Sequence, residues 1–340
     1  MMPPIHNHLT AYLTRILVSY TIYDIQHNVK HLSMIPTYWI KESTLADDNT
    51  ATLAIRVMKE TNLDAADTLR SLAGWNQARQ DWLRLLALQP EGCFVAEHEG
   101  QVIGTVTTTC YGSRQAWIGM LLVHPEWRGR GIGRALMRHA LDYLRTEGVA
   151  CAGLDATPAG EPLYLGLGFR PAWTLARWEA GALKRTLLPP SNAHVQPVQK
   201  AHWETIIDLE AYAFGVPRPR LLHALAQQSQ AVNVATDESG QVRGFGMRRA
   251  GASAHYLGPV IAVRPEDAAP LIASLLQGLE GQPVCWDIPA PNRAAVKLAT
   301  AYGFTCQRGL TRMVLGRRTR RSCPQHRPEI QFAITGFATG

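Results

Sequence analysis

This chain of 340 residues lacks two features that would place it among secreted or membrane proteins. Its six cysteines form no CxxC pair, and several lie within apolar stretches typical of strands. We therefore expect reduced thiols in the core and a cytoplasmic protein, because disulfide frameworks belong mainly to small secreted domains. The apolar stretch from Leu9 to Tyr23 is interrupted by Arg15 and is too short to span a bilayer. We expect neither a transmembrane segment nor a membrane partner.

Charged residues are also sparse, at 18% of the chain against 46% hydrophobic residues, which is the balance of a globular protein. The formal net charge of +7 favours anionic ligands. The positive excess is scattered and partly concentrated in a basic loop at Arg317, Arg318, Arg320 and Arg321. This pattern is too weak for a nucleic-acid-binding protein, and we expect no nucleic acid partner.

The first fifty residues show no clear pattern. Their histidines, at positions 6, 8, 27 and 31, lack the spacing of metal ligands, and we expect no metal site. The segment also lacks an apolar region followed by a small-residue cleavage site, which argues against a secretory signal. We interpret residues 1–50 as an N-terminal extension, with Met34 as a later candidate start.

Residues 51–188 have the hydrophobic pattern of one α/β domain with a mixed sheet. Alternation and apolar runs predict strands over residues 53–57, 93–97, 101–108, 117–123 and 151–156, and a last strand after Phe169. Helices are predicted over residues 64–74, 76–88, 132–144 and 162–167. The seven apolar residues of 117–123 indicate a strand buried on both faces.

Residues 193–340 repeat this order in weaker form. Gly100–Gly104 is echoed by Gly240–Gly244, and the strand with Asp155 has a counterpart with Asp287. Gly168-Phe169 likewise returns as Gly303-Phe304 after a helix over residues 293–302. We expect two duplicated domains joined by a proline-rich linker over residues 187–197, and a final strand over residues 330–335.

A loop rich in arginine and glycine, Val123–Leu136, follows the buried strand and opens an amphipathic helix. Glycines at that place let backbone N–H groups converge on an anion, and the helix N-terminus adds partial positive charge. A dinucleotide-binding fingerprint would need Gly-x-Gly-x-x-Gly directly after the first strand, and a Walker loop would need Gly-Lys-Ser/Thr. The sequence has neither here. The loop therefore predicts a different pyrophosphate site.

This loop resembles the acetyl-CoA signature of the GCN5-related N-acetyltransferase (GNAT) superfamily, Arg/Gln-x-x-Gly-x-Gly/Ala, with matches at Arg128, Gly131 and Gly133. The resemblance covers about residues 53–178. It implies two acyl-CoA N-acyltransferase folds in tandem, with acetyl-CoA as cosubstrate. The implied reaction is direct transfer of an acetyl group to a primary amine of a small molecule or peptide in a ternary complex.

The family fold implies that the buried strand splays from its neighbour and offers its backbone to the pantetheine arm, with the pyrophosphate at the loop. The implied cofactor-binding residues are Leu121, Leu122, Val123, Arg128, Gly129, Arg130, Gly131, Ile132, Gly133 and Arg134. Tyr164 stands at the position that resembles the family's general acid, which would protonate the leaving thiolate.

The general base stays open, because Ile118, Gly119 and Met120 stand where many relatives have a carboxylate. Glu97, His98 and Asp155 are candidates, and so is a water chain. Cys151 could carry an acetyl group covalently, but its place at the start of an apolar strand favours a core thiol.

The second half lacks the catalytic features of the first. Its equivalent loop, residues 263–270, has no glycine and carries Glu266 and Asp267, while Ala299 stands at the counterpart of Tyr164. We expect a degenerate domain that either covers a sheet edge or forms a wall of the acceptor pocket. The candidate residues for that wall are His255, Tyr256, Asp287 and Asn292.

An alternative function is a noncatalytic acyl-CoA sensor or interaction module, in which the cofactor only stabilises the fold. A homodimer is left open by the sequence.

Overall fold

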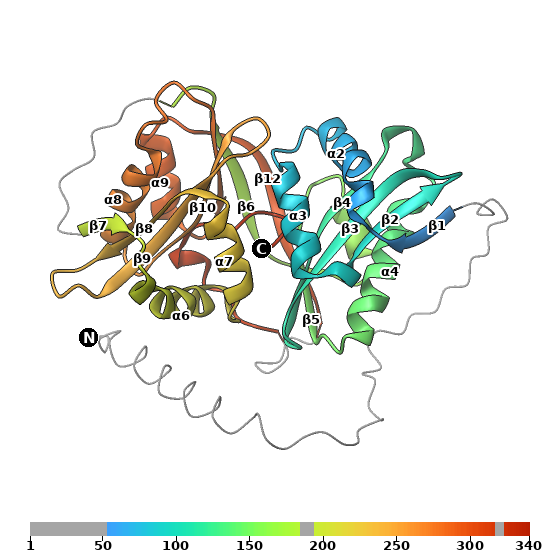
Figure 1. Ribbon diagram of the computed structural model, residues 1–340, viewed down its shortest axis with the longest axis horizontal. Helices are drawn as coiled ribbons and strands as arrows, with labels where there is room; N and C mark the ends of the chain where they lie inside the picture. Colours follow the sequence, from blue (N-terminus) through green and yellow to red (C-terminus); the bar gives the residue numbers. More distant parts are fainter. Residues whose placement is uncertain (1–52, 184–193, 317–322) are drawn as a thin grey trace, which may run out of the picture. The chain divides into compact units, whose positions relative to one another are not determined.

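The computed structural model describes residues 53–183, 194–316 and 323–340 (Figure 1). The predicted extension 1–50 and the basic loop 317–321 lie outside these residues. In the described part of the chain, no helix combines the length and the hydropathy needed to cross a membrane. The same residues contain no cluster of three or more His, Cys, Asp or Glu side chains that could hold a metal ion.

The first half has the predicted order of elements. Its strands are β1 (Leu53–Val57), β2 (Cys93–His98), β3 (Gln101–Tyr111), β4 (Gln115–Val123), β5 (Cys151–Ala156) and β6 (Arg170–Ala180). Its helices are α2 (Leu63–Leu72), α3 (Arg79–Leu88), α4 (Ile132–Thr146) and α5 (Glu161–Leu165). Helix α3 begins three residues later than predicted, because the Asn76 side chain accepts hydrogen bonds from the N–H groups of Ser253 and Ala254 (2.9 Å each). This contact with the second half holds Asn76 outside the helix.

The second half repeats the order. Its strands are β7 (His194–Pro197), β8 (Ser229–Thr236), β9 (Val242–Arg249), β10 (His255–Ala262), β11 (Val284–Pro289), β12 (Thr305–Gly316) and β13 (Gln331–Ala333). Its helices are α6 (Trp203–Phe214), α7 (Pro219–Gln227), α8 (Pro265–Leu276) and α9 (Arg293–Ala301). The predicted linker 187–197 is wrong at its end, because residues 194–197 pair with β8 as an edge strand and Val195 packs on the core. The predicted final strand forms as β13.

The described strands form one mixed sheet in which the two halves exchange a strand. The order is β1-β2-β3-β4-β5-β12-β6-β11-β10-β9-β8-β7, and β13 pairs with β10 beside this path. Strand β12 of the second half lies between β5 and β6 of the first, and β6 lies between β12 and β11. Figure 1 shows β6 and β12 next to one another where the halves meet. Each half therefore completes its sheet with a strand from the other.

Each half has two central strands that pair in parallel over a short stretch and then separate. Strands β4 and β5 pair at Ala116–Ala152 and Trp117–Gly153, although β4 continues to Val123. Strands β10 and β11 pair over three positions, from His255–Val284 to Leu257–Trp286. The splay implied by the family resemblance is thus present twice.

In the second half the splay is filled. Strand β13 pairs with β10 at Val260–Ala333 and Ile261–Gln331. On the β11 side, the Trp286 indole N–H donates to the Phe332 carbonyl at 2.7 Å. Phe332 is fully buried. A segment of the chain itself therefore occupies the place where the first half has an open slot.

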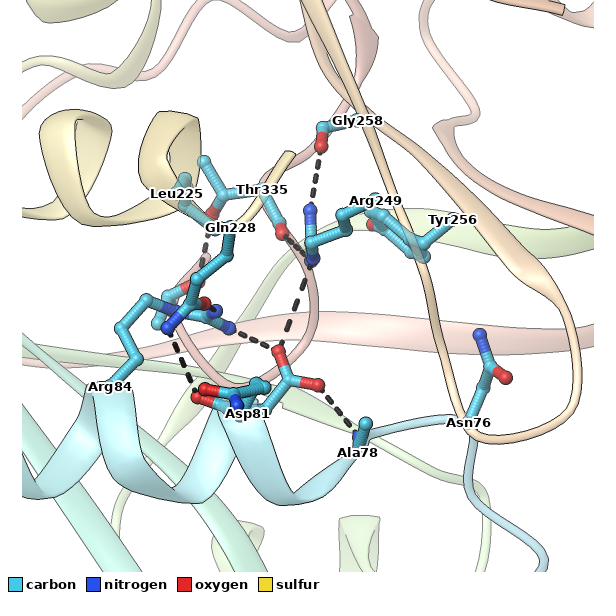
Figure 2. A network of polar contacts seen from close by, with 12 residues as sticks. Asn76, Ala78, Asp81, Arg84, Leu225, Gln228, Arg249, Tyr256, Gly258 and Thr335 are labelled. Carbon is cyan, nitrogen blue, oxygen red and sulfur yellow. Dashed lines mark hydrogen bonds and ion pairs between the residues drawn. The ribbon is translucent and has the colours of Figure 1, made fainter. Parts of the chain in front are cut away.

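A buried polar network joins α3 to the second half (Figure 2). Arg84 donates to Asp81 on its own helix and to Gln228 after α7. Arg249 donates to the carbonyls of Gly258 and Thr335, at 2.6 Å each, and lies 4.0 Å from the Asp81 carboxylate. Burial alone would raise the pKa of Asp81, but Arg84 and Arg249 together hold it below its ordinary value. The two halves are thus fixed to each other by charge as well as by the shared sheet.

The expectation that the cysteines are reduced core thiols is wrong for one pair. Cys151, at the start of β5, and Cys323 form a disulfide with a Cα–Cα distance of 5.3 Å. Strand β12 explains the approach, because it ends at Gly316 opposite Cys151, and the chain returns to this point at Cys323. The remaining cysteines are free, and of these Cys93 and Cys285 are buried as predicted.

Candidate active site

A cavity of about 710 Å³ lies at the splay of β4 from β5. One group of lining residues comes from β4, the following loop and the start of α4: Ile118, Gly119, Met120, Leu121, Leu122, Val123, Trp127, Arg128, Gly129, Gly131, Ile132, Gly133 and Arg134. A second group comes from β5, α5 and the segment between them: Leu154, Asp155, Thr157, Ala159, Gly160, Leu163 and Tyr164. A third comes from the α2–α3 connection and the second half: Leu72, Ala73, Trp75, Gln77, Arg308, Leu310, Phe337 and Ala338.

A β-bulge in β4 helps to open the cavity. Thr107 pairs with Gly119 and Thr105 with Leu122, so two residues of β4 oppose a single residue of β3. Met120, inside the bulge, has a φ of 49°, and its carbonyl accepts a hydrogen bond from the Thr105 hydroxyl at 2.8 Å. A bulge bends its strand and increases the local twist. The bend lies just beyond the last β4–β5 pair, where the two strands part.

The loop after β4 presents free backbone donors to the cavity. Gly129 and Gly131 have φ values of 77° and 79°, and no atom lies within 4 Å of where a Cβ would stand on either. The first hydrogen bond of helix α4 is donated by Ala135 to the Gly131 carbonyl, so the preceding N–H groups have no partner in the helix. Such a turn can hold an anion through backbone amides and the positive end of the helix dipole.

The three arginines of the loop take different positions. Arg128 and Arg134 line the cavity, and Arg128 is held by a hydrogen bond from its Nε to the Val123 carbonyl at 3.1 Å. Arg130 instead lies over the Trp127 ring at 4.7 Å and is not part of the lining. The structure therefore brings the predicted cofactor-binding residues together in one cavity, with Arg130 as the exception.

Tyr164 lines the same cavity from α5. Its ring packs edge-on against Phe169, with 6.0 Å between ring centroids. Burial raises the pKa of its hydroxyl to about 12. The hydroxyl thus stays protonated at physiological pH and is available as a proton donor.

The three candidate bases are placed less favourably for proton transfer than Tyr164 is. Glu97 is paired with Arg56, and the His98 ring packs on Trp127 at 4.5 Å; neither side chain lines the cavity. Asp155 does line it, but both of its carboxylate oxygens accept from the Arg312 guanidinium, at 2.8 and 2.9 Å. Burial raises the pKa of Asp155, and Arg312 opposes that shift.

Gly119 explains why no carboxylate stands on β4. A Cβ on Gly119 would lie 2.7 Å from the Cα and 2.8 Å from the carbonyl oxygen of Ala338. The last residues of the chain therefore occupy the space that a side chain at this position would need. Trp117 anchors the same segment by donating from its indole N–H to the Phe337 carbonyl at 2.9 Å.

The second half does supply a wall of the cavity, but not with the residues expected from the sequence. Arg308 and Leu310 of β12 and Phe337 and Ala338 of the last segment form this wall. The four expected residues lie elsewhere and have structural partners. His255 contacts Gln230 and Gln282, Tyr256 donates to Ile334, Asp287 pairs with Arg177, and Asn292 caps α9.

Most of this wall leaves no signal in the sequence. Strand β12 reaches the first half through the strand exchange, which leaves no trace in hydrophobic periodicity. Phe337 and Ala338 follow β13 in a segment without regular secondary structure. The small residues on either side of Phe337, which are Gly336, Ala338, Thr339 and Gly340, are the one hint that this segment packs closely against another backbone.

Two further features bear on the chemistry. Cys151 is buried and bonded to Cys323, which excludes it as a thiolate nucleophile in this state. In the second half, α8 begins after Arg264 with Glu266 and Asp267 in its first turn. Ala299, the counterpart of Tyr164, is fully buried.

Two family models match the chain, one in each half. The acetyltransferase (GNAT) family matches residues 58–169, and a second acetyltransferase (GNAT) domain model matches residues 206–326. The uncharacterized N-acetyltransferase YitH of Bacillus subtilis (strain 168) is 25% identical over 232 residues, which cover 68% of this chain and 80% of YitH.

Solved structures show the same fold. A protein from Pyrococcus horikoshii superposes with a TM-score of 0.72 at 22% identity, covering 88% of this chain and 99% of its own. A tandem GNAT protein from the clavulanic acid biosynthesis pathway has a TM-score of 0.58 at 15% identity, with coverage of 77% and 98%.

Proposed function

Because the chain belongs to the GNAT superfamily and carries two GNAT domains in tandem, we propose that its first half transfers an acetyl group from acetyl-CoA to a primary amine. The acceptor in this proposal is a small molecule or a peptide end. The observation that carries the proposal is the open splay between β4 and β5, which leads directly into the N-terminus of α4.

The residues at this end of the cavity fit acetyl-CoA. The open space above Gly129 and Gly131 leaves room for a pyrophosphate against the N–H groups at the start of α4, with Arg128 and Arg134 beside it. The edge of β4 beyond Trp117 has no partner in β5, so its backbone is available to the amide groups of a pantetheine arm. When bound, acetyl-CoA would supply the acetyl thioester that the amine attacks.

Tyr164 is the general acid in this proposal, because its raised pKa keeps a proton on the hydroxyl until the thiolate needs it. Among the described lining residues, Asp155 is the one carboxylate, and Arg312 occupies both of its oxygens. We therefore assign deprotonation of the acceptor ammonium to water rather than to a side chain. The disulfide at Cys151 favours direct transfer over a covalent enzyme intermediate.

The cavity volume of about 710 Å³ lies within the range of about 300 to 1,000 Å³ that is usual for small-molecule sites. Phe337 and Ala338 line the cavity at Gly119 of β4, away from the arginine- and glycine-rich loop. The space that they occupy favours a small acceptor, or the end of a peptide, over a folded protein surface.

A cytoplasmic location stays part of the proposal and is testable through the cysteines. Denatured protein that has kept the Cys151–Cys323 disulfide should titrate as four free thiols, at positions 93, 110, 285 and 306. Thiol titration of the chain isolated under non-reducing conditions would check this count. A cytoplasmic location predicts six free thiols, because a reducing compartment keeps this pair reduced, whereas a count of four would argue against that location.

A thermal-shift titration followed by a thiol-release assay tests the proposed function. Acetyl-CoA at 100 times its Kd should stabilise the fold by about 2.7 kcal/mol, and the absence of any shift would exclude the cofactor. Release of free CoA with a member of a panel of polyamines, aminoglycosides, amino acids and peptides would establish transfer. A shift without release from any amine would instead support a noncatalytic acyl-CoA sensor.

A further inference from the structure

Arg308 of β12 lines the cavity without a counter-ion. Its Nε is buried and has no hydrogen-bond partner, and no ion pair or hydrogen bond joins its guanidinium to any described residue. Arg84 and Arg248 also have an unpartnered Nε, but their Nη atoms donate to other groups. Burial without a partner is costly for a charged group and lowers the pKa of Arg308. Among the described residues, the cation therefore has no ion pair or hydrogen bond that would explain its place by structure alone.

The neighbouring charges compensate Arg308 only in part. The carboxylates of Asp287 and Glu179 act on it through space, but no hydrogen bond or ion pair joins either of them to it in the described part of the chain. On β6 Arg308 lies opposite Arg177, a second cation. The nearby Asp287 carboxylate accepts from Arg177 through both oxygens, at 2.7 Å each. Asp155, the carboxylate in the cavity lining, is likewise occupied by Arg312. Both buried carboxylates thus already have an arginine partner, and Arg308 is left over.

Arg308 lies at the end of the cavity away from the phosphate loop. Its guanidinium carbon is 5.7 Å from the centroid of the Phe337 ring, and the next residue, Ala338, packs on Gly119 of β4. Gly119 and Val123, where the arginine- and glycine-rich loop begins, pair with Thr107 and Gly104 of β3, which are three residues or roughly 10 Å apart along an extended strand. A group bound at Arg308 would therefore belong to the acceptor rather than to the pyrophosphate.

We propose that Arg308 binds a carboxylate of the acceptor, so that the substrate carries its amine and a carboxylate in the same molecule. This inference rests on the proposed acetyl transfer to an amine. A guanidinium offers several N–H donors in a planar arrangement that matches a carboxylate. The α2–α3 connection, β12 and the last segment contribute mostly apolar lining residues, Leu72, Ala73, Trp75, Leu310, Phe337 and Ala338, and one further polar side chain, Gln77. The acceptor class that fits is an amino acid with an apolar side chain.

Binding of a carboxylate without an amine tests the inference independently of catalysis. The probes are 3-phenylpropanoate and 4-methylpentanoate, each compared with its carboxamide, titrated calorimetrically into protein saturated with CoA. The wild type should bind each acid at least about tenfold more tightly than its amide. Arg308→Gln should lose that preference, Arg308→Lys should keep part of it, and Arg293→Gln, an exposed arginine on α9, should keep all of it.

The transfer reaction supplies the second readout. The value of kcat/KM is measured for phenylalanine, leucine and methionine and for the corresponding amides. The ratio of the value for the acid to the value for the amide should be at least about tenfold lower in Arg308→Gln than in the wild type. The Kd for acetyl-CoA should not change. Arg308→Gln should fold, because the substitution removes a half-buried charge without an ion-pair partner, and its Tm without ligand should equal or exceed that of the wild type.

Three results would overturn the inference. These are equal binding of acid and amide by the wild type, no binding of either acid, or a weaker acetyl-CoA affinity in Arg308→Gln, which would place Arg308 in the cofactor site. Failure of the proposed function looks different. In that case no amine releases CoA, while the acid preference and its dependence on Arg308 still appear in the binding titration.

Discussion

The two halves of the chain have the same elements in the same order, yet the space between their central strands is used in opposite ways. In the first half, β4 and β5 separate after Trp117 and leave a cavity. In the second half, β10 and β11 separate after Leu257 and the gap holds β13. The splay is therefore a property of the fold, and what lies in the splay decides whether a ligand can bind.

The starts of the helices that follow the two splayed strands also differ in whether they leave room for a ligand. The N-cap of helix α4 is Gly131, whose left-handed backbone and missing side chain leave the N–H groups open. The N-cap of helix α8 is Arg264, and the first turn of α8 carries Asp267, which accepts from Arg264 at 3.1 Å. The acidic group that stabilises the start of α8 would repel a phosphate there. The second half thus has internal contacts at the place where the first half has the open loop of the proposed cofactor site.

The largest effect is expected from removing the side chain of Phe332, which lies in the gap between β10 and β11. Phe332→Ala should lower the free energy of unfolding by about 3 to 5 kcal/mol, because a fully buried aromatic side chain is lost. Urea denaturation followed by tryptophan fluorescence would measure it. Phe332→Leu, which keeps most of the apolar volume, should cost clearly less. A loss below about 1 kcal/mol in the alanine variant would show that β13 is not part of the core.

The second-largest effect is expected at Tyr164, the proposed general acid, which has no equivalent in the second half. Tyr164→Phe should lower kcat by about 100-fold with little change in acetyl-CoA affinity, since the hydroxyl acts on the leaving thiolate. Assays that follow the release of the CoA thiol over time would measure kcat. An unaltered kcat would refute the acid role.

The pH profile gives an independent check on Tyr164. A pKa raised to about 12 means that the hydroxyl remains protonated at every lower pH, so no loss of the acid should appear up to about pH 10. The rate should therefore rise with pH as the acceptor amine loses its proton, and then level off. A fall in kcat between pH 8 and 10 would contradict a tyrosine acid with a raised pKa.

A smaller effect is expected at the start of α4. Gly131→Ala forces a side chain into the left-handed region and should weaken acetyl-CoA binding about tenfold, by about 1 to 2 kcal/mol. Gly278→Ala is the matched control, because Gly278 has a φ of 78° and equally open surroundings in the second half. Calorimetric titration should show an unchanged Kd for the control. Equal losses in both variants would point to a general effect on folding instead.

The smallest effect is expected from altering the start of α8. Asp267→Asn removes the acidic charge from the first turn but leaves β13 in the slot. The stoichiometry of acetyl-CoA should stay at about one per chain in both this variant and the wild type. A second binding event in either protein would show that β13 leaves its slot.

The sequence determined the features that depend on neighbouring residues. The loop from Arg128 to Arg134, the helix it opens and Tyr164 lie within one local stretch, and glycine spacing and apolar periodicity predict them because the physical cause is local. The same holds for the order of strands and for the degenerate α8 loop. The boundary of α3 and the linker end at residues 194–197 were wrong because contacts with the other half decide both.

Only the tertiary structure decided what closes the site. The exchange of β6 and β12, the disulfide of Cys151 with Cys323, and the approach of Ala338 to Gly119 join residues more than 100 positions apart. Such pairs are selected by packing and by the pairing of backbone groups, and no local pattern encodes which partner is chosen. The sequence therefore predicted the loop of the proposed cofactor site, while only the fold placed Arg308 in the same cavity, at the end that we propose for the acceptor.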